Sequence, residues 1–281
     1  MKTPIPELPA FSIDANVDGL LYCRGEDGNI IMRNGKKAKL DGVFPLRKGF
    51  VQYANGFSKD DKAVYCWGHR LAGANPATFR ALSYAFATDG THVWTHMGKV
   101  KGADAATFMA CDHGAPVAKR WGDGYGKDCN SVYFSSSSSR ATRVIKANPE
   151  TFESCGEWCN LGFDDRFIFA EGASIPKAKR KTWHYLAHNY SRDENSFFYL
   201  RRRIEGADPH SFQIVPINDK WSKRGAPLAK DDNHYYWCDS VIDNDEFGAE
   251  YWMNSAIVSD VNDMPPIARQ LGWKLKNIIG S

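Results

Sequence analysis

The chain has 281 residues, and its 43% hydrophobic content is enough to build a sizeable core in one large or two ordinary domains. The formal net charge of +3 is close to balanced, so charge gives no reason to expect a nucleic acid or a membrane surface as partner. The seven cysteines are an odd number in a chain too large to need staples, which fits reduced thiols better than a disulfide framework.

The amino-terminal region, residues 1–47, is predicted to be a cap that precedes a repeat array. Its first residues are rich in Pro and lack the charged-then-apolar layout of a secretory signal. No segment of the chain has the 18 or more continuous apolar residues of a membrane span, so we expect a cytoplasmic protein. Two apolar runs, Leu20–Tyr22 and Ile30–Met32, flank Asp27–Asn29 and predict a hairpin.

Residues 48–242 carry a repeated pattern with a period of about 29 residues. An Asp is followed at plus four and plus five by two apolar or aromatic residues, at plus eleven by an aliphatic residue, at plus fourteen by Ala and at plus nineteen by an aromatic residue. Five copies are clear and a sixth is partial; they begin at Asp60, Asp89, Asp128, Asp164, Asp193 and Asp231. The third copy holds a five-residue insertion at the serine run Ser135–Ser139. Such a period predicts small units that are stable only when stacked on their neighbours.

Each copy is predicted to form a β-hairpin followed by a short helical turn. The Asp begins a turn, because its side chain can accept hydrogen bonds from backbone N–H groups two residues on. The plus-four and plus-five residues then start one strand, and the plus-eleven residue lies on the return strand. Segments such as Gly73–Pro76 place an Asn at a helix N-cap and a Pro at the first helical position. The fold class is therefore mainly β, with tandem hairpins in a single domain.

The aromatic residues at plus five and plus nineteen are assigned to the core between neighbouring units. Phe79 and Phe212 are two examples of the plus-nineteen position, and burial of each should stabilise the fold by roughly 2 to 3 kcal/mol. The alternative use of the plus-five aromatic residues is a stacking platform for sugars or bases.

The carboxy-terminal region, residues 243–281, is predicted to be a second cap that contains a helix. Pro265 and Pro266 precede a run of apolar residues at helical spacing. These residues are Ile267, Leu271, Leu275 and Ile278. Repeat arrays require such caps at their ends, and partner binding is the other reading of this region.

Two features point to a partner-binding surface. Insertions at Met109–Gly122 and Gln213–Leu228 break the period, and insertions in repeat arrays map to loops on one face, which is often the binding face. The densest acidic cluster stands next to two Trp residues, a combination that suits a protein interface. Its residues are Asp243, Asp245, Glu246 and Glu250, with Trp237 and Trp252. A solvated acidic cap is the alternative reading of this cluster.

The segment Lys230–Tyr236, with the sequence KDDNHYY, and the segment Gly206–Phe212, with the sequence GADPHSF, resemble the bacterial DKNYY family. The repeats of that family carry an Asp-Lys-Asn-x-x-Tyr-Tyr core followed by Gly-Ala-Asp-Pro-x-x-Phe. The resemblance extends from Phe57 to about Ile242, although Gly90 replaces the Lys and Ala105 the Pro in the second copy. It implies a repeat fold and a likeness to accessory or immunity proteins of toxin systems, and it supplies no active-site residue.

No catalytic, cofactor-binding or metal-binding residue is assigned from the sequence. His92 with His96, and His184 with His188, have the spacing of two zinc ligands on a helix, but the repeat places the first pair across a strand and a hairpin tip. The Asp column supplies one carboxylate per unit, whereas calcium needs six to eight converging oxygens.

We therefore expect a non-enzymatic binding protein, most concretely an immunity protein that neutralises a bacterial toxin acting in the cytoplasm. Its partner would be a protein, the cognate toxin, and neither a nucleic acid nor a membrane. The alternative is a glycan-active enzyme with dispersed carboxylates such as Asp164, Asp165 and Glu171, which would have to lie about 5 to 10 Å apart. A carbohydrate-binding protein that uses exposed aromatic residues is a further alternative.

Overall fold

The structure, a computed structural model, describes residues 5–17, 20–24, 30–32, 48–113, 123–136, 138–156, 159–214 and 228–242. The chain divides into two compact units, Met1–Pro176 and Lys177–Ser281. Within the described residues, no helix is long and apolar enough to cross a membrane.

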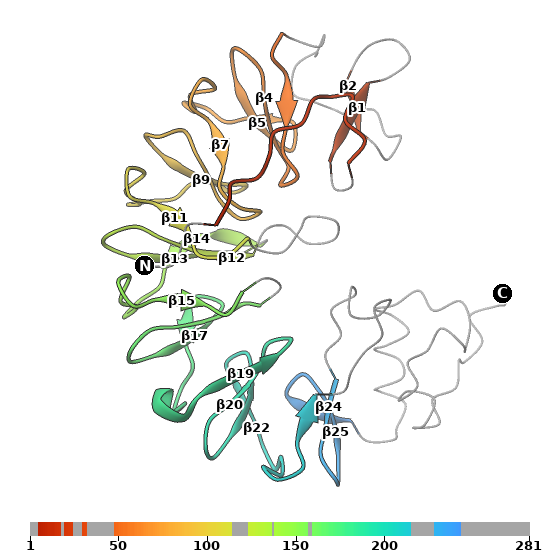
Figure 1. Ribbon diagram of the computed structural model, residues 1–281, viewed down its shortest axis with the longest axis vertical. Coiled ribbons are helices and arrows are strands. Elements are labelled where there is room, and N and C mark those ends of the chain that lie inside the picture. The colour runs from red at the N-terminus through yellow and green to blue at the C-terminus, as the bar shows by residue number, and fades with distance from the viewer. Residues whose placement is uncertain are drawn as a thin grey trace, which may run out of the picture. The chain divides into compact units, whose positions relative to one another are not determined.

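The described repeats form four-stranded antiparallel sheets in which strands that follow one another in sequence are hydrogen-bonded neighbours. The first unit contains four of these sheets (Figure 1). Sheet 1 comprises β3 (Val51–Gln52), β4 (Phe57–Lys59), β5 (Val64–Cys66) and β6 (His69–Arg70); sheet 2 comprises β7 (Arg80–Ala81), β8 (Ala87–Thr88), β9 (Val93–Thr95) and β10 (Gly98–Lys99). Sheet 3 comprises β11 (Met109–Ala110), β12 (Gly124–Lys127), β13 (Val132–Ser136) and β14 (Ser139–Arg143); sheet 4 comprises β15 (Glu153–Ser154), β16 (Leu161–Phe163), β17 (Ile168–Ala170) and β18 (Ala173–Ser174).

The second unit contains two sheets of the same design. Sheet 5 comprises β19 (His184–Ala187), β20 (Tyr190–Arg192), β21 (Phe197–Tyr199) and β22 (Arg202–Ile204); sheet 6 comprises β23 (Gln213–Ile214), β24 (Leu228–Lys230), β25 (Tyr235–Trp237) and β26 (Ser240–Ile242).

The sequence repeat and the sheet are out of phase. The predicted hairpin is present and forms the third and fourth strands of each sheet; in sheet 2, for example, the plus-eleven residue Val100 donates its N–H to the carbonyl of the plus-four residue Val93 at 2.8 Å. The sequence did not predict the first two strands. The second strand ends directly before the repeat Asp, and the first begins directly after the plus-nineteen aromatic residue, as β7 does after Phe79. One sequence period therefore spans two adjacent sheets.

The predicted helical turns between sheets are not supported. The segment around Asn75 is a turn, and the helix that the described residues contain is a short 3-10 helix, η1 (Arg180–Thr182). The side chain of Asn75 accepts a hydrogen bond from the backbone N–H of Ala77 at 3.0 Å and closes a local turn. Phe79 is buried in the core only two residues later, which leaves no room for a helix. The predicted helix over residues 267–278 lies outside the described residues.

Within each unit, the core lies between the faces of successive sheets. Phe57 and Val64 of sheet 1 pack with Ala87 and Trp94 of sheet 2, and Phe79 fills the space where the chain passes from one sheet to the next. The plus-five aromatic residues are all buried: Tyr65, Trp94, Tyr133, Phe169, Phe198 and Tyr236. This position is therefore the predicted core position, and a stacking platform for sugars or bases at plus five is ruled out.

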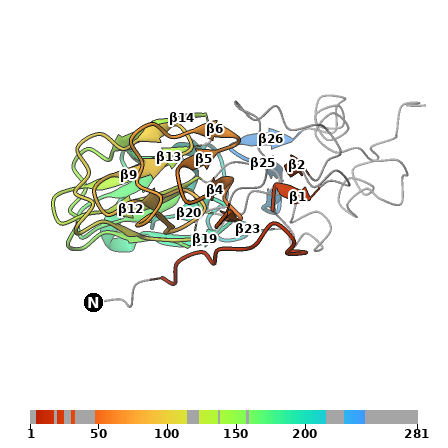
Figure 2. The same ribbon diagram turned by 90° about the horizontal axis from the view of Figure 1, so that it is seen from above.

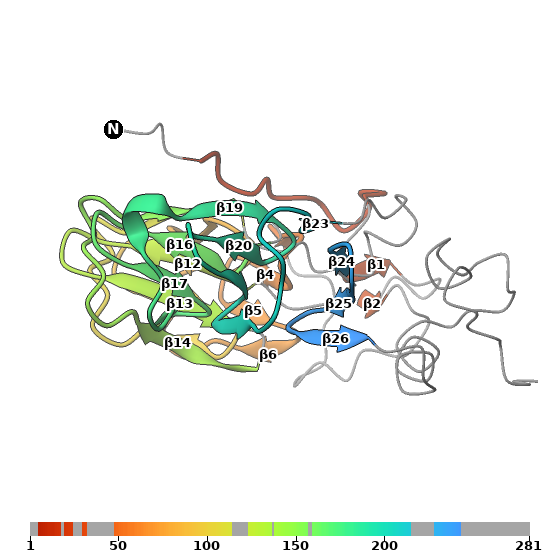
Figure 3. The same cartoon turned by 90° about the horizontal axis from the view of Figure 1, so that it is seen from below.

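The N-terminal region contains the predicted hairpin, formed by β1 (Tyr22–Arg24) and β2 (Ile30–Met32). Before it, residues 5–11 form an extended stretch that runs along one side of the first unit's sheets (Figures 2 and 3). Ser136 and Ser139 of the serine run pair with each other at the tip of the β13–β14 hairpin.

Candidate functional site

The acidic cluster predicted as a binding surface is not described by the structure. Asp243, Asp245, Glu246, Glu250 and Trp252 lie outside the described residues. The backbone of Trp237 is described and pairs with Leu228 and Ser240 in sheet 6. That cluster stays a prediction.

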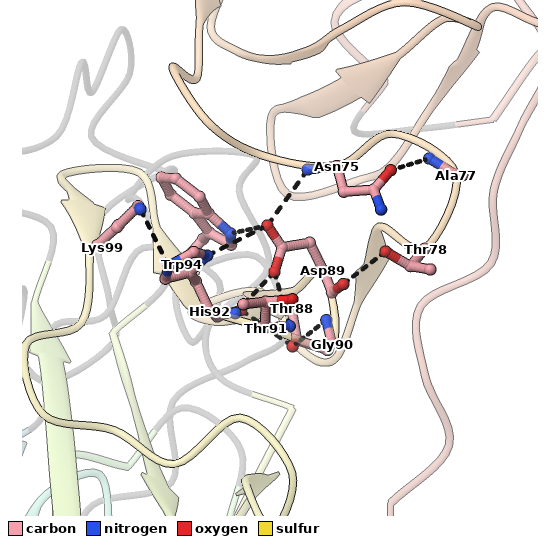
Figure 4. Close-up of polar contacts among 10 residues, drawn as sticks. All are labelled: Asn75, Ala77, Thr78, Thr88, Asp89, Gly90, Thr91, His92, Trp94 and Lys99. Atoms are coloured by element: carbon pink, nitrogen blue, oxygen red, sulfur yellow. Dashed lines mark hydrogen bonds and ion pairs between the residues drawn. The ribbon is translucent and has the colours of Figure 1, made fainter.

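The repeat Asp begins the turn between the second and third strands, which we call the Asp turn. In sheet 2, one carboxylate oxygen of Asp89 accepts the backbone N–H groups of Thr91 at 2.9 Å and His92 at 2.7 Å (Figure 4). The other oxygen accepts the indole N–H of Trp94 at 3.2 Å and the backbone N–H of Asn75 at 3.2 Å. The carboxylate thus closes its own turn and binds the turn that precedes its sheet.

The same arrangement recurs along the chain. Asp128 accepts the backbone N–H groups of Asn130 and Ser131, the hydroxyl of Tyr133 at 3.1 Å, and the backbone N–H of Asp104 at 2.8 Å. In five repeats the Asp accepts a backbone N–H from the turn that precedes its sheet; the donors are Asn75, Asp104, Asn148, Lys179 and Asp208. The Asp column therefore links each of these five sheets to the turn before it, and also caps the Asp turns.

The Lys before the Asp provides a second link. The ammonium of Lys59 donates to the carbonyl oxygens of Pro76 at 2.8 Å and Phe79 at 2.9 Å, and burial lowers the pKa of this Lys. Lys127 makes the equivalent bonds to Pro149 and Phe152. The Lys of one sheet and the Asp of the next therefore hold the connecting turn from its two sides.

These contacts lower the pKa of two of the repeat carboxylates, Asp89 and Asp231. Burial alone would raise the pKa of Asp231, but the hydrogen bonds from Tyr236 at 2.6 Å and from three backbone N–H groups outweigh it and lower that pKa from 3.8 to about 2. For Asp89, too, hydrogen bonds outweigh burial and lower the pKa. A buried carboxylate whose oxygens are engaged in this way is poorly placed to act as a general acid or base near neutral pH.

This shift predicts a pH dependence of stability. Because the pKa of Asp231 is lower in the folded than in the unfolded chain, the stabilisation is complete above about pH 5 and is lost as the pH falls through 2. Asp231→Asn cannot titrate, so the gap in free energy of unfolding between wild type and this variant should shrink between pH 5 and pH 2. Asp232→Asn, at the exposed neighbouring position, should follow the wild-type curve. A gap that stays constant with pH would contradict the assignment.

The other candidate chemical groups are separated by strands. His92 and His96 stand before and after β9, and Lys99 donates to Nε2 of His92 at 3.1 Å. His184 and His188 are four residues apart along β19 and the turn after it, or about 13 Å at the rise of a strand, too far to share one zinc ion. Among the residues that the structure describes, no three His, Cys, Asp or Glu side chains form a group that could hold a metal ion.

The two insertions occupy equivalent places in their sheets. Residues 111–123 connect β11 to β12, and residues 215–227 connect β23 to β24, so each joins the first strand of a sheet to the second. In sheet 5 the same connection is the tight turn of His188 and Asn189. Because neighbouring strands of a meander alternate in direction, this connection leaves the sheet at the end opposite to the Asp turn. The extended serine hairpin joins the third strand of sheet 3 to the fourth and leaves at that same end.

The long connection of sheet 3 is fixed at both ends. Near its start, Asp112 accepts the hydroxyl of Ser154 and the backbone N–H of Tyr125 at 3.2 Å; at its end, Asp123 accepts the side-chain amide of Asn160 at 3.4 Å. The buried hydroxyl of Tyr125 donates to the carbonyl of Asn160 at 3.1 Å. Hydrogen bonds to sheet 4 therefore hold both ends of this connection, at Asp112 and Asp123, in place.

Stacked four-stranded meanders joined by one repeated turn define a tandem β-repeat protein. The DKNYY family model matches residues 57–240, from β4 into β26, and the chain belongs to this family. The match covers all six Asp turns, so the motif for which the family is named coincides with the links between sheets. No curated protein and no solved structure matches the chain.

Proposed function

We propose that this chain is a non-enzymatic binding protein whose contact surface is the end of the first unit's sheets opposite to the Asp turns. The observation that carries the proposal is the placement of the insertions. Both long connections, and the serine hairpin, are additions to the repeat at that end of their own sheets. In repeat proteins, additions confined to one end of the units mark the surface that varies with the ligand.

The anchoring of residues 111–123 favours binding of a large partner. Hydrogen bonds at Asp112 and Asp123 restrict the two ends of the connection before any partner arrives. A segment whose ends are already ordered loses less conformational entropy on binding, which increases affinity. At the Asp-turn end, the carboxylates of Asp89 and Asp128 already accept hydrogen bonds from the preceding turns. They are therefore not available to bind a partner.

The carboxylates named for a glycan-active enzyme are poorly placed for that role. Asp164 is 1% exposed and accepts backbone N–H groups from Arg166, Phe167 and Asn148. Glu171 lies in the turn after β17, at the opposite end of that strand from Asp164. This supports the binding hypothesis over hydrolysis by this particular set of residues.

The partner that we propose is a bacterial toxin that acts in the cytoplasm, which makes the chain its immunity protein. The support is the resemblance of the DKNYY repeats to accessory and immunity proteins of toxin systems, together with the additions to the repeat at one end of the sheets. The acidic cluster at Asp243–Glu250 is the second candidate contact region.

Protection of cells tests this proposal. The chain should protect cells that produce the effector encoded beside its gene, and the purified proteins should bind in surface plasmon resonance. A shortened variant in which the dipeptide Gly-Ser replaces residues 114–122 retains Asp112 and Asp123. It should bind at least tenfold more weakly without a change in melting temperature. Glu150→Lys, at the Asp-turn end, is the matched control and should bind like wild type.

Two results would count against the proposal. If the shortened variant binds normally and a triple charge reversal at Asp243, Asp245 and Glu246 does not, the interface is the acidic cluster. If the wild-type chain neither binds nor protects against the effector, the immunity assignment is wrong.

A further inference from the structure

The N-terminal region contacts the edge formed by the first strands of the first unit's sheets. Residues 5–11 cross these strands as an extended segment (Figure 2). Phe11 and Gln52 of β3 exchange two backbone hydrogen bonds at 2.8 Å, and the N–H of Leu8 donates to the carbonyl of Ala81 of β7 at 3.0 Å. The segment therefore bonds to sheet 1 and then to sheet 2.

The contacts of this segment recur every third residue. Leu8 packs against the core cluster shared by sheets 1 and 2, and Ile5 packs against the next cluster, which includes Phe108 and Ala110 at sheet 3. Ile5, Leu8 and Phe11 are partly buried. The residues between them are exposed: Pro6, Glu7, Pro9 and Ala10.

The period of three matches the spacing of the sheets. An extended chain rises about 3.1 to 3.4 Å per residue, so three residues cover about 10 Å, and sheets packed face to face lie about 10 Å apart. One triplet thus spans one sheet spacing. Pro6 and Pro9 each follow an anchor residue, where the chain has no N–H to donate and the ring restricts it to extended conformations.

A charged contact adds selectivity to binding along this edge of the sheets. Glu7 pairs with Arg80 of β7, and both side chains remain about half exposed. A ligand with an acidic residue just before the anchor that reaches Ala81 would reproduce this ion pair. The same contact would disfavour a basic residue at that position.

We propose that the outer edge of β3 and β7, extending towards β11, is a docking track for an extended segment of a partner protein. That segment consists of triplets of an apolar residue, Pro and a third residue, with an acidic residue before the anchor at β7. The chain's own residues 5–11 occupy the track as a tethered internal ligand. Their anchors are only partly buried and make few backbone bonds, so a partner segment can displace them. The inference is independent of the immunity assignment.

Binding of a synthetic peptide to the full chain tests the track. The probe is a fluorescent peptide of residues 1–13, and the receptor is the full chain with Leu8→Asp and Phe11→Asp, which releases its own segment. Anisotropy should show binding at least tenfold tighter to this variant than to wild type, in which the internal segment competes. A control peptide with Leu8 and Ala10 exchanged has the same composition but loses the period of three and should not bind.

The ion pair gives an independent arm. Arg80→Glu in the released variant should weaken binding of the native peptide. A peptide carrying Glu7→Arg should restore binding to this Arg80→Glu receptor. Circular dichroism checks folding; if the double variant is unfolded, Leu8→Asp alone serves as receptor. A folded variant that binds native and exchanged peptides equally, or neither, overturns the proposal. Dimerisation of wild type that Leu8→Asp abolishes would also overturn it, because the occupant would then be a second copy of the chain.

Discussion

Replacing Phe79 by alanine should lower the free energy of unfolding by about 3 to 5 kcal/mol. The side chain is 2% exposed and lies where sheets 1 and 2 meet. Its ring centroid is 5.4 Å from that of Phe57 and 6.1 Å from that of Tyr53. Neighbouring strands on both sides restrict collapse, so the substitution should leave a cavity and loosen two sheets together.

Denaturation with urea measures this loss. Leu71→Ala is the matched control, because Leu71 packs at the margin of the same cluster and is only partly buried. It should cost clearly less than Phe79→Ala. Equal and small losses for the two variants would mean that Phe79 does not fill the space between the sheets.

The equivalent substitution in the last full repeat should have a smaller effect. From sequence position alone, Phe212 and Phe79 are expected to contribute equally. In the structure Phe212 is partly buried and stacks on Phe197 with a centroid distance of 4.0 Å. A ring that retains contact with solvent loses less transfer free energy when it is removed.

The spacing of the repeat predicted the third and fourth strands because two consecutive apolar or aromatic residues, a turn signal and an aliphatic residue at plus eleven recur in each copy. The first strands escaped prediction since most have two residues, such as Arg80 and Ala81, too few to show a period of two. They are strands because the neighbouring second strand pairs with them, as Ala87 does with Ala81. That information lies in the assembled sheet and not in the local sequence.

The candidate binding surfaces, too, could be predicted only in part from the local sequence. The insertions were visible as breaks in the period, but their common place between first and second strands required the sheet order. The contacts of residues 5–11 were not predicted at all. The alternation of Ile5, Leu8 and Phe11 with Pro6 and Pro9 is a period-three signal, which matches neither the helix period of 3.6 nor the strand period of 2.

The role of the Asp column was predicted only in part. The side-chain bond to the Asp's own turn follows from residue type, and loss of such a cap costs about 1 kcal/mol. The bond to the preceding turn joins residues 24 positions apart, as Asp128 and Asp104 are, and cannot be read from either segment. The structure therefore raises the expected cost of removing the Asp above the estimate for a cap.

Asp128→Ala should destabilise the first unit by about 3 to 5 kcal/mol. The substitution removes the acceptor for three backbone N–H groups and for the hydroxyl of Tyr133. Each buried donor left without a partner costs about 1 to 3 kcal/mol, although water entering the shortened side chain's space will satisfy some of them. The loss should appear in urea denaturation as a lower midpoint with an unchanged slope.

Two further variants separate the cap from the link. Asp61→Ala, at an exposed position in the equivalent turn of sheet 1, should change stability by no more than about 0.5 kcal/mol. Asp128→Asn keeps one oxygen for the N–H groups of its own turn but turns an NH2 group towards the N–H of Asp104, so its loss should be intermediate. If Asp128→Ala cost only about 1 kcal/mol, the hydrogen bond from the Asp104 N–H to Asp128 would contribute nothing to stability beyond the cap. Successive sheets would then be held together by their apolar faces alone.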